Sequence, residues 1–433
     1  MNHIRTLILG GGMSGLSCAY HLNSPYLLLE RSDEPGGLSR SIKQDGFVYD
    51  HTGHLLHLRN PYTLKLIPDL LGDNLCLNER RAWIYSHHTY TRYPFQANTF
   101  GLPTRVIKEC VNGFINAQID SQPGPAAGPE SLRSWVLRTF GKGFGKYFFF
   151  PYNEKLWTVS ADVLTSEWVA PFVPKPSITE AIDGALSDQT KKFGYNTIFY
   201  YPKEGGIQAL AFAFAKPLTG VRLETEVTAI DLSKKEVTTS VGETLAYDHL
   251  VTTLPLARFL KLTKPLPLEI QAALSLLRWN SVYNLNLGIA RANISDKHWI
   301  YFPEKKYRFY RVGFPMNFST HMTPPGCSSM YTEISYTPGN HPDDRQAYRD
   351  IVRGLHDCGL LTRSDKIISQ KVLDIPCAYV IYDQNRTPTV NNLLAYLESL
   401  NVHSIGRFGA WKYSYMEEAI LEGKSTAEKI DGV

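Results

Sequence analysis

The sequence predicts an α/β protein built around a dinucleotide-binding βαβ unit, and two observations support this fold class. Residues Leu7 to Gly15 read LILGGGMSG, an apolar strand run followed by the spacing GxGxxG. Twenty residues after Gly10, the carboxylate of Glu30 ends the apolar run YLLLE. A strand, a glycine-rich turn, a helix and a second strand that ends in an acidic residue are the parts of such a unit.

The three glycines of the motif have separate roles. Gly10 permits the tight turn, Gly12 lets the backbone approach a pyrophosphate, and Gly15 lets the helix press onto the sheet. The first amides of that helix then face the phosphates. Glu30, at the end of the second strand, is placed to accept hydrogen bonds from an adenosine ribose.

A second glycine pair follows the acidic residue closely. Arg31 to Ser41 reads RSDEPGGLSRS, and FVYDHTGH then brings His54 close behind. A nicotinamide dehydrogenase has no need of this pair. The run ER followed by GGLSRS resembles the FAD-binding families of the amine oxidase, phytoene desaturase and UDP-galactopyranose mutase kind, in which the second glycine pair runs along the flavin. This resemblance implies that FAD is the cofactor.

Two further pieces resemble the same families. LETEVTAID would hold the adenine through the backbone of Val227, and SIGRFGAWKY is similar to the last flavin contact. A helix-like run from Glu417 to Ile430 would point its N-terminus at the flavin, where the helix dipole favours negative charge. The residues expected to bind FAD are Gly10, Gly12, Met13, Ser14, Gly15, Glu30, Arg31, Gly36, Gly37, Leu38, Ser39, Gly53, His54, Val227, Arg407, Met416 and Glu417.

Composition sets broad limits. The 433 residues are 43% hydrophobic, which suits two or three globular domains, and 45 basic against 41 acidic residues give a net charge of +4. This balance argues against a nucleic-acid surface. No apolar stretch approaches the length of a membrane span. The first strand starts close to Met1, which leaves no room for a signal peptide, and the six cysteines show no CxxC pair, so a cytoplasmic protein is expected.

The chain is expected to form a discontinuous Rossmann-like FAD-binding domain from residues 1–80, 200–264 and 399–433. Residues 81–199 are expected to be a mostly helical substrate domain. They include the breaker-rich QPGPAAGPE at 122–130, which has the composition of a lid loop. The strand-like pieces VYNLNLGIA, HWIYFP, YRFYRVGF and MYTEISY place a mixed or antiparallel substrate-side sheet in residues 265–398.

Five blocks occur along most of the chain in the order of one family. They are YPFQ from Tyr93, SWVLRTFGKGFGKYFFFPYNEKLW from Ser134, GYNTIFYYPKEGG from Gly194, WIYFPEKKYRFYR from Trp299 and GRFGAWKY from Gly406. Together they resemble the UDP-galactopyranose mutases, especially the eukaryotic branch. In that family, reduced flavin attacks the anomeric carbon of a nucleotide sugar, and the mutase reaction has no net redox change. NAD(P)H is the candidate reductant.

The resemblance also implies roles for site residues. His54 would lie against the flavin near N5, and the guanidinium fork of Arg311 would clamp the leaving diphosphate. The hydroxyl groups of Tyr301, Tyr379 and Tyr413 would bind the same phosphates. The sugar pocket and the nucleobase site would be formed by Asn153, Trp157, Tyr93, Gln96 and Asn196.

Ordinary structural roles compete with these assignments. The chain has 25 tyrosines, so a single tyrosine is more often part of the core than a ligand contact. Tyr413 is the best placed of the three because it lies inside GRFGAWKY, and Tyr379 is the weakest. His54 could be one hydrogen-bonded histidine among several, Arg311 could be a surface arginine, and Trp157 is better explained as helix core.

One departure from the family affects the substrate. The mutases have a second diphosphate arginine four residues after a tryptophan in a SEW-like segment, whereas Trp168 is followed at that distance by Phe172. An apolar ring in place of a charge-assisted contact, worth about 1.5 to 3 kcal/mol, should weaken binding of a diphosphate. Lys155 or Lys175 could supply the charge, but lysine cannot form the bidentate fork.

Two other functions remain open at this stage. One is a redox flavoenzyme of the amine oxidase, protoporphyrinogen oxidase or desaturase type, with Phe172 in an apolar substrate pocket. The other is a non-catalytic FAD-binding protein. A metal site is not expected, because Thr52 and Gly53 break the helix that would align His51, His54 and His57. No GxSxG elbow of a hydrolase is present.

Overall fold

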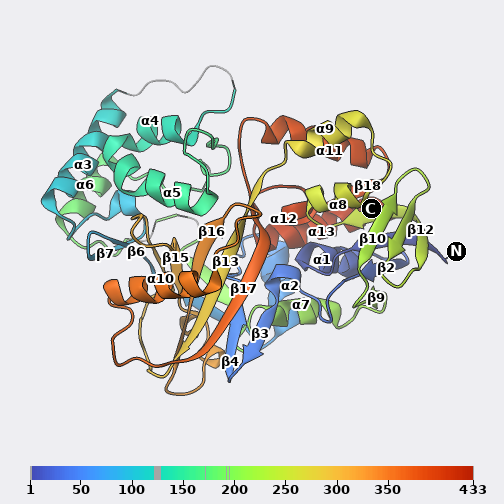
Figure 1. Cartoon of the computed structure of the whole chain (residues 1–433), viewed down its shortest axis with the longest axis horizontal. Helices are drawn as coiled ribbons and strands as arrows, with labels where there is room; N and C mark the ends of the chain where they lie inside the picture. The colour runs from blue at the N-terminus through green and yellow to red at the C-terminus, as the bar shows by residue number, and fades with distance from the viewer. Residues whose placement is uncertain (1, 121–127, 171, 192, 195, 433) are drawn as a thin grey trace.

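Two seven-stranded sheets, one toward each end of the molecule, dominate the architecture (Figure 1). The computed structural model describes residues 2–120, 128–170, 172–191, 193–194 and 196–432. The loop expected over 122–130 therefore lies for the most part outside the described residues. The α/β fold class, with one mixed nucleotide-binding sheet and one mostly antiparallel sheet, is confirmed.

The first sheet contains the expected βαβ unit. Strand β1 (Asn2–Leu9) lies between β2 (Tyr26–Leu29) and β12 (Thr244–Thr252), and both pairings are parallel. Helix α1 (Met13–His21) connects β1 to β2. The remaining strands of this sheet are β9 (Val221–Arg222), β10 (Val227–Asp231), β11 (Glu236–Thr239) and β18 (Val402–Ser404). In the sequence, residues 221–252 alternate strand-like runs with polar turns at 233–235 and 242–243, and the strands of the structure follow this alternation.

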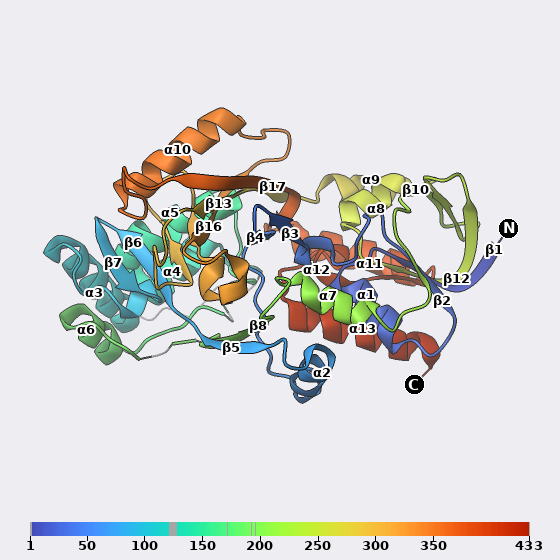
Figure 2. The same ribbon diagram turned by 90° about the horizontal axis from the view of Figure 1, so that it is seen from below.

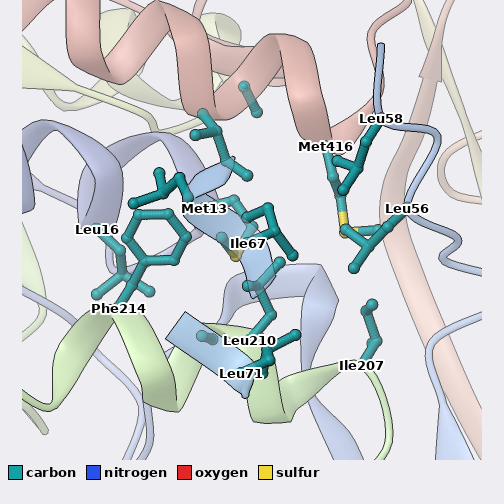
Figure 3. Packing of buried hydrophobic residues seen from close by; sticks show 14 of the residues in the cluster. Met13, Leu16, Leu56, Leu58, Ile67, Leu71, Ile207, Leu210, Phe214 and Met416 are labelled. Atoms are coloured by element: carbon teal, nitrogen blue, oxygen red, sulfur yellow. The ribbon is translucent and has the colours of Figure 1, made fainter. Parts of the chain in front are cut away.

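Helices cover both faces of this sheet, as a parallel core requires. On one face, α1 packs against α7 (Gln208–Ala215) and α13 (Met416–Asp431), and α7 also contacts α2 (Pro61–Leu71). Figure 3 shows side chains of Met13, Ile67, Leu210, Phe214 and Met416 meeting in the core of this layer. The expected C-terminal helix is confirmed with bounds one residue wider at each end.

The opposite face of the sheet is covered by α8 (Leu256–Leu262), α9 (Leu268–Ser275) and α11 (Arg386–Glu398). Both α9 and α11 come from the segment 265–398, which was expected to form only the substrate-side sheet. The physical reason is their apolar positions: Ile270, Val390, Leu393 and Leu397 are all buried in one cluster with the strands of the nucleotide-binding sheet.

The second sheet has the order β17-β13-β16-β15-β14-β6-β7. The four strand-like pieces expected in 265–398 each contribute one strand, namely β13 (Trp279–Ile289), β14 (Trp299–Tyr301), β15 (Arg311–Gly313) and β16 (Ser328–Tyr336). Strand β17 (Ile367–Val380) was not expected from the sequence, nor was α10 (Asp344–Asp357), which lies on the outer side of this sheet (Figure 2).

Two strands of this sheet come from residues 81–199, which were expected to be mostly helical. Strands β6 (Ala82–Ser86) and β7 (Thr89–Arg92) form a hairpin, and β6 pairs in parallel with β14. Their two-residue turn is made by His87 and His88, with φ of 51° and 59°. Positive φ at both turn positions matches the twist of a hairpin, but histidines are a weak signal for it.

The rest of that segment is helical as expected, with α3 (Thr104–Ile119), α4 (Leu132–Phe144), a single π-helical turn (Gly145–Phe149), α5 (Phe150–Trp157) and α6 (Ile178–Leu186). Gly141 allows α3 and α4 to touch, since a Cβ there would lie 2.0 Å from the carbonyl oxygen of Gly113. The short elements are β3 (Ser41–Gln44), β4 (Phe47–Asp50), β5 (Cys76–Glu79), β8 (Ile198–Tyr201) and α12 (Gly406–Gly409).

Candidate functional site

The glycine-rich turn forms the cradle expected for a dinucleotide. Gly10 has φ +101°, and a Cβ at Gly15 would lie 2.0 Å from the Gly10 carbonyl oxygen, so neither position accepts a side chain. A Cβ at Gly12, by contrast, would meet nothing closer than the Cα of Gly37 at 4.0 Å. Open space over the Gly12 backbone, at the N-terminus of α1, fits a pyrophosphate that approaches the chain closely.

The second glycine pair packs directly on the first. The Gly36 amide donates to the Gly11 carbonyl oxygen at 2.8 Å, and Gly12 and Gly36 form a parallel bridge. The loop then reaches the start of α13, where the Ser39 hydroxyl lies 3.6 Å from the sulfur of Met416. The GGLS loop and the N-termini of α1 and α13 thus line one continuous backbone surface, which fits an extended FAD molecule.

Glu30 is buried at the end of β2, beside the glycine-rich turn. Its side chain is 7% exposed and accepts hydrogen bonds from the amides of Gly11 at 2.7 Å and Ser32 at 2.9 Å. A carboxylate has about four acceptor positions, so two remain for ribose hydroxyls. Burial next to two N–H donors keeps this acid in a fixed orientation.

Glu417 was expected to bind FAD at the start of the C-terminal helix, and its side chain is engaged within the protein. Its carboxylate accepts from the amides of Arg59 and Asn60, at 2.7 and 2.8 Å, and from the hydroxyl of Thr63. The side chain of Glu417 therefore holds the start of α2 to α13. The backbone amide of Glu417, in the first turn of α13, is the group of this residue that fits cofactor binding. Val227 lies in β10 as expected, whereas the side chain of Arg31 is exposed.

His54 lies in the extended segment that follows β4, as expected. Burial first, and then His51, Arg407 and Arg311, lower the pKa of His54 to about 3. The imidazole is therefore neutral at physiological pH, with one N–H donor and one acceptor nitrogen. Gly53 beside it has no room for a side chain, because a Cβ would lie 2.3 Å from the hydroxyl of Tyr331. Within the described residues, no group of three or more His, Cys, Asp or Glu side chains could hold a metal.

Three site residues form a row across the second sheet. Tyr301 in β14 is directly opposite Arg311 in β15, which is in turn opposite Glu333 in β16. Directly opposed residues share one face of a sheet. The row continues to Asn284 in β13, whose amide nitrogen donates to the Asp50 carbonyl oxygen at 3.3 Å. This contact ties the row to the segment that carries His54.

Arg311 and Glu333 form a buried bidentate ion pair. Nε and one terminal nitrogen of Arg311 donate to the two carboxylate oxygens at 2.8 and 2.7 Å, and Glu333 is fully buried. Burial lowers the pKa of Arg311, but Glu333 and the neighbouring tyrosines raise it well above the ordinary value. The guanidinium is thus permanently charged, and its remaining N–H groups are available to a second anion.

Arg407 joins two of the predicted tyrosines. Its guanidinium carbon lies 5.2 Å from the ring centre of Tyr379 and 5.1 Å from that of Tyr413. The arginine also donates to the carbonyl oxygens of Ser414 at 2.6 Å and Ala378 at 3.3 Å. Tyr379 and Tyr413, which are distant in sequence, are therefore held around one cation, and both remain partly exposed.

The two residues predicted for the sugar pocket lie on α5. Trp157 is fully buried, and its ring centre is 5.3 Å from that of Tyr379 and 4.4 Å from that of Trp168. The position of Trp157 agrees with a packing role. It also places the Trp157 ring against Tyr379, a predicted phosphate ligand. Asn153 is 4% exposed, and its amide nitrogen donates to the Phe149 carbonyl oxygen at 2.8 Å.

The residues predicted for the nucleobase are brought together with one arginine that was not predicted. Arg80 donates to Asn196, and its guanidinium carbon lies 5.0 Å from the ring centre of Tyr93. The rings of Tyr93 and Tyr301 are 5.5 Å apart, so this group adjoins the row across the sheet. Gln96 is 2% exposed, and its side chain donates to the Pro174 carbonyl oxygen at 2.7 Å.

Lys155, one of the two lysines that could supply the charge of the missing arginine, is engaged elsewhere. Its ammonium donates to the carbonyl oxygens of Phe302, Glu304 and Phe309, at 2.7, 3.2 and 2.7 Å, so all three N–H groups are in use. Lys175 is exposed, with Nζ 5.8 Å from the ring centre of Trp135. Phe172 packs against Tyr413, with ring centres 6.0 Å apart.

Sequence reasoning missed Arg80, Glu333 and Tyr152. Tyr152 lies on α5 with its ring centre 5.2 Å from that of Tyr301. A signal for Glu333 was present, since it is the only charged residue in the strand run SSMYTEISY. A single acid in a strand whose neighbours are buried requires a cationic partner. Arg80 gave no such signal, because its neighbours in space come from distant segments.

Comparisons with known proteins show the family of the chain. The model of the flavin-containing amine oxidoreductase family matches residues 13–431, so the chain belongs to that family. A crystal structure of reduced UDP-galactopyranose mutase is similar with a TM-score of 0.92 at 25% identity, over 99% of this chain and 96% of that chain.

Two oxidases share the fold at lower similarity. A putative protoporphyrinogen oxidase from Exiguobacterium sp. 255-15 has a TM-score of 0.76 at 17% identity, over 99% of this chain and 98% of that chain. A double mutant of putrescine oxidase has 0.69 at 15% identity, over 100% of both chains. These two similarities show the fold alone. Of the helices in the described residues, none has both the length and the apolar character to cross a membrane.

Proposed function

We propose that this flavoprotein is a mutase of the UDP-galactopyranose mutase type, which interconverts ring forms of a nucleotide sugar without net redox change. The observation that carries the proposal is the permanently charged Arg311, set opposite Tyr301 and near neutral His54. An oxidase of small amines has no use for a buried anion clamp. A cytosolic location and NAD(P)H as the reductant belong to the same proposal.

The chain supplies the parts that such a reaction needs besides the cofactor. Bound FAD, when reduced, supplies a nucleophilic nitrogen. Arg311 and the hydroxyls of Tyr301, Tyr379 and Tyr413 bind the diphosphate and stabilise the charge that develops on it as the anomeric bond breaks. Glu333 holds the guanidinium in one orientation, so little reorganisation is needed when the charge appears.

The other residues orient the nucleotide sugar. Tyr93, Asn196 and Arg80 form a partly exposed group next to Tyr301 that suits a nucleobase. Gln96 is buried and bonded to the Pro174 carbonyl oxygen. Helix α5, which carries Asn153 and Trp157, lies beside Tyr379, where a sugar attached to the diphosphate would lie. Neutral His54 can donate or accept a hydrogen bond at the edge of the flavin without a change in its own charge.

The test is an isomerisation assay on purified protein that contains flavin. The protein is reduced with dithionite and incubated with UDP-galactopyranose, UDP-galactofuranose and other nucleotide sugars, and the products are separated by chromatography. We expect conversion of one such pair, with the flavin still reduced at the end. Absence of both binding and conversion for every nucleotide sugar would refute the proposal.

A second candidate is a true oxidoreductase, which one observation favours. Phe172 places an aromatic ring on Tyr413 where the mutases carry an arginine, and the adjoining Trp168 extends this apolar wall. Such a wall suits an apolar substrate. In that case a substrate would bleach the visible absorbance of the flavin under anaerobic conditions without dithionite.

A further inference from the structure

The predicted substrate groups lie on two separate parts of the chain. Asn153 and Trp157 are on α5, in the helical segment, whereas Tyr301 and Arg311 are on adjacent strands of the second sheet. The turn 302–310 connects these two strands. A reaction at the bond between sugar and diphosphate needs both parts in one fixed arrangement, since small misplacements are costly in rate.

One buried ammonium group connects the two parts. Lys155 lies on α5 between Asn153 and Trp157, and its Nζ donates to three carbonyl oxygens of the turn, those of Phe302, Glu304 and Phe309. All three N–H groups of the ammonium are used, and the contacts span the turn from its first residue to its eighth. Burial lowers the pKa of Lys155 to about 7, which Glu304 opposes.

The turn is fixed on its other sides by the rigid sheet. The Glu304 carboxylate accepts from the His87 amide, in the β6–β7 turn, at 3.0 Å, and Arg308 pairs with Asp350 on α10 at 2.9 Å. Phe302 and Tyr310 close the turn with a backbone hydrogen bond of 2.9 Å. Since these contacts hold the turn to the sheet, the lysine fixes α5 to the turn. A second polar contact, from the Asn280 amide in β13 to the Leu156 carbonyl oxygen at 2.6 Å, holds the end of α5 to the sheet but does not reach the turn.

We propose that Lys155 is a positioning residue that aligns the sugar-binding helix α5 with the diphosphate-binding pair Tyr301 and Arg311. It acts through the turn 302–310 and touches neither substrate nor cofactor. The role assigned to the two residue groups rests on the proposed function, whereas the mechanical link between α5 and the turn does not.

The test compares Lys155→Met, which keeps the length of the side chain and loses its donors, with Lys155→Arg, which keeps charge and donors. Lys146→Met is the matched control, because Lys146 lies in the same helical segment and pairs with Glu109 at the surface. Hydrogen exchange of the full-length, flavin-loaded protein is measured in peptides from 150–157 and 302–310. We expect faster exchange of both peptides in Lys155→Met, substantial recovery in Lys155→Arg, and no change in Lys146→Met.

Kinetics give the second measurement. For Lys155→Met we expect kcat to fall roughly tenfold, which corresponds to about 1.4 kcal/mol, while the dissociation constant of UDP changes by less than about twofold. Unchanged exchange in both peptides, or equal losses of kcat and UDP affinity without recovery in Lys155→Arg, would overturn the inference. If the exchange result holds in a protein that converts no nucleotide sugar, the proposed function fails and the link remains. If Lys155→Met does not fold, the recovery in Lys155→Arg is measured against Lys155→Gln.

Discussion

The cofactor cradle and the substrate side of the site differ in how the chain builds them. The cradle is formed mostly from backbone between Gly10 and Gly37, with glycines where the chain must approach itself or a ligand. The proposed substrate side is formed from side chains on β14, β15, β17, α5 and the loop after α12. Local backbone geometry leaves a motif in the sequence, whereas convergence of distant side chains does not.

The largest effect is expected in the cradle. Gly12→Ala should abolish FAD binding while the protein still folds, because the new Cβ meets nothing closer than 4.0 Å in the chain but occupies the space over the backbone. The ratio of flavin to protein absorbance measures the loss, and circular dichroism reports the fold. Gly339→Ala, where φ is +89° and a Cβ meets nothing within 4 Å, serves as the control for backbone strain outside the cradle, because it should lose some stability and keep its flavin. A fully flavin-loaded Gly12→Ala protein would contradict the close approach of a pyrophosphate.

The next effect belongs to the substrate side. Arg311→Ala leaves Glu333 buried without its partner, which should cost about 3 to 5 kcal/mol of stability. It should also weaken UDP binding by roughly 10- to 150-fold, as expected for loss of a charged hydrogen-bonding group. Thermal melting and equilibrium binding measure the two effects. Arg291→Ala, which breaks a similar bidentate pair with buried Asp365, should lower stability alone. UDP affinity that is the same in Arg311→Ala and the wild type would remove Arg311 from the clamp.

An intermediate effect concerns pH. The pKa of His54 is lowered to about 3, whereas the unfolded chain takes up this proton near its ordinary value. Between these two values the unfolded state binds more protons, so stability falls as the pH falls below about 6.5. The melting temperature of His54→Asn should therefore decrease less between about pH 7.5 and pH 5 than that of the wild type. An equal decrease in both proteins would mean that His54 is not buried in its neutral form.

The smallest effects should come from single hydroxyl groups. Tyr301→Phe, Tyr379→Phe and Tyr413→Phe each remove one hydrogen bond, worth about 0.5 to 1.5 kcal/mol, so UDP affinity should fall roughly 2- to 12-fold. Titration of UDP against the flavin spectrum gives the values. Tyr396→Phe, a tyrosine on α11 outside the site, is the control. If the three site variants all behave like the control, the diphosphate lies elsewhere.

The features that could be predicted from the sequence follow the same division between local backbone geometry and distant side chains. The βαβ unit, the second glycine pair, the position of Glu30 and the strands around Val227 could be predicted because each depends on residues close in sequence. The hairpin of β6 and β7 could not, since its turn uses His87 and His88 rather than glycine or asparagine. No distinct turn or cap residues mark the ends of strand β17 and helix α11 in the sequence. Both elements are held by burial against distant strands.

Within the site, the residue types were easier to predict than their partners. Arg311 and Tyr413 could be named from their blocks, but the pairing of Arg311 with Glu333 depends on the register of β15 against β16. The use of Lys155 depends on where the turn 302–310 falls in space, which no local pattern encodes. Glu417 likewise fastens α2, a segment more than 300 residues earlier in the chain, a contact that only the fold creates.

The central claim, that the flavin works here as a nucleophile without net redox change, is tested most directly by one paired measurement. Turnover of UDP-galactopyranose and UDP-galactofuranose is measured with the same protein in its oxidised and its dithionite-reduced form, without oxygen. The account predicts interconversion by the reduced form alone, with no change in flavin absorbance during turnover. Equal turnover by the oxidised form, or bleaching of the oxidised flavin by a substrate, would contradict it.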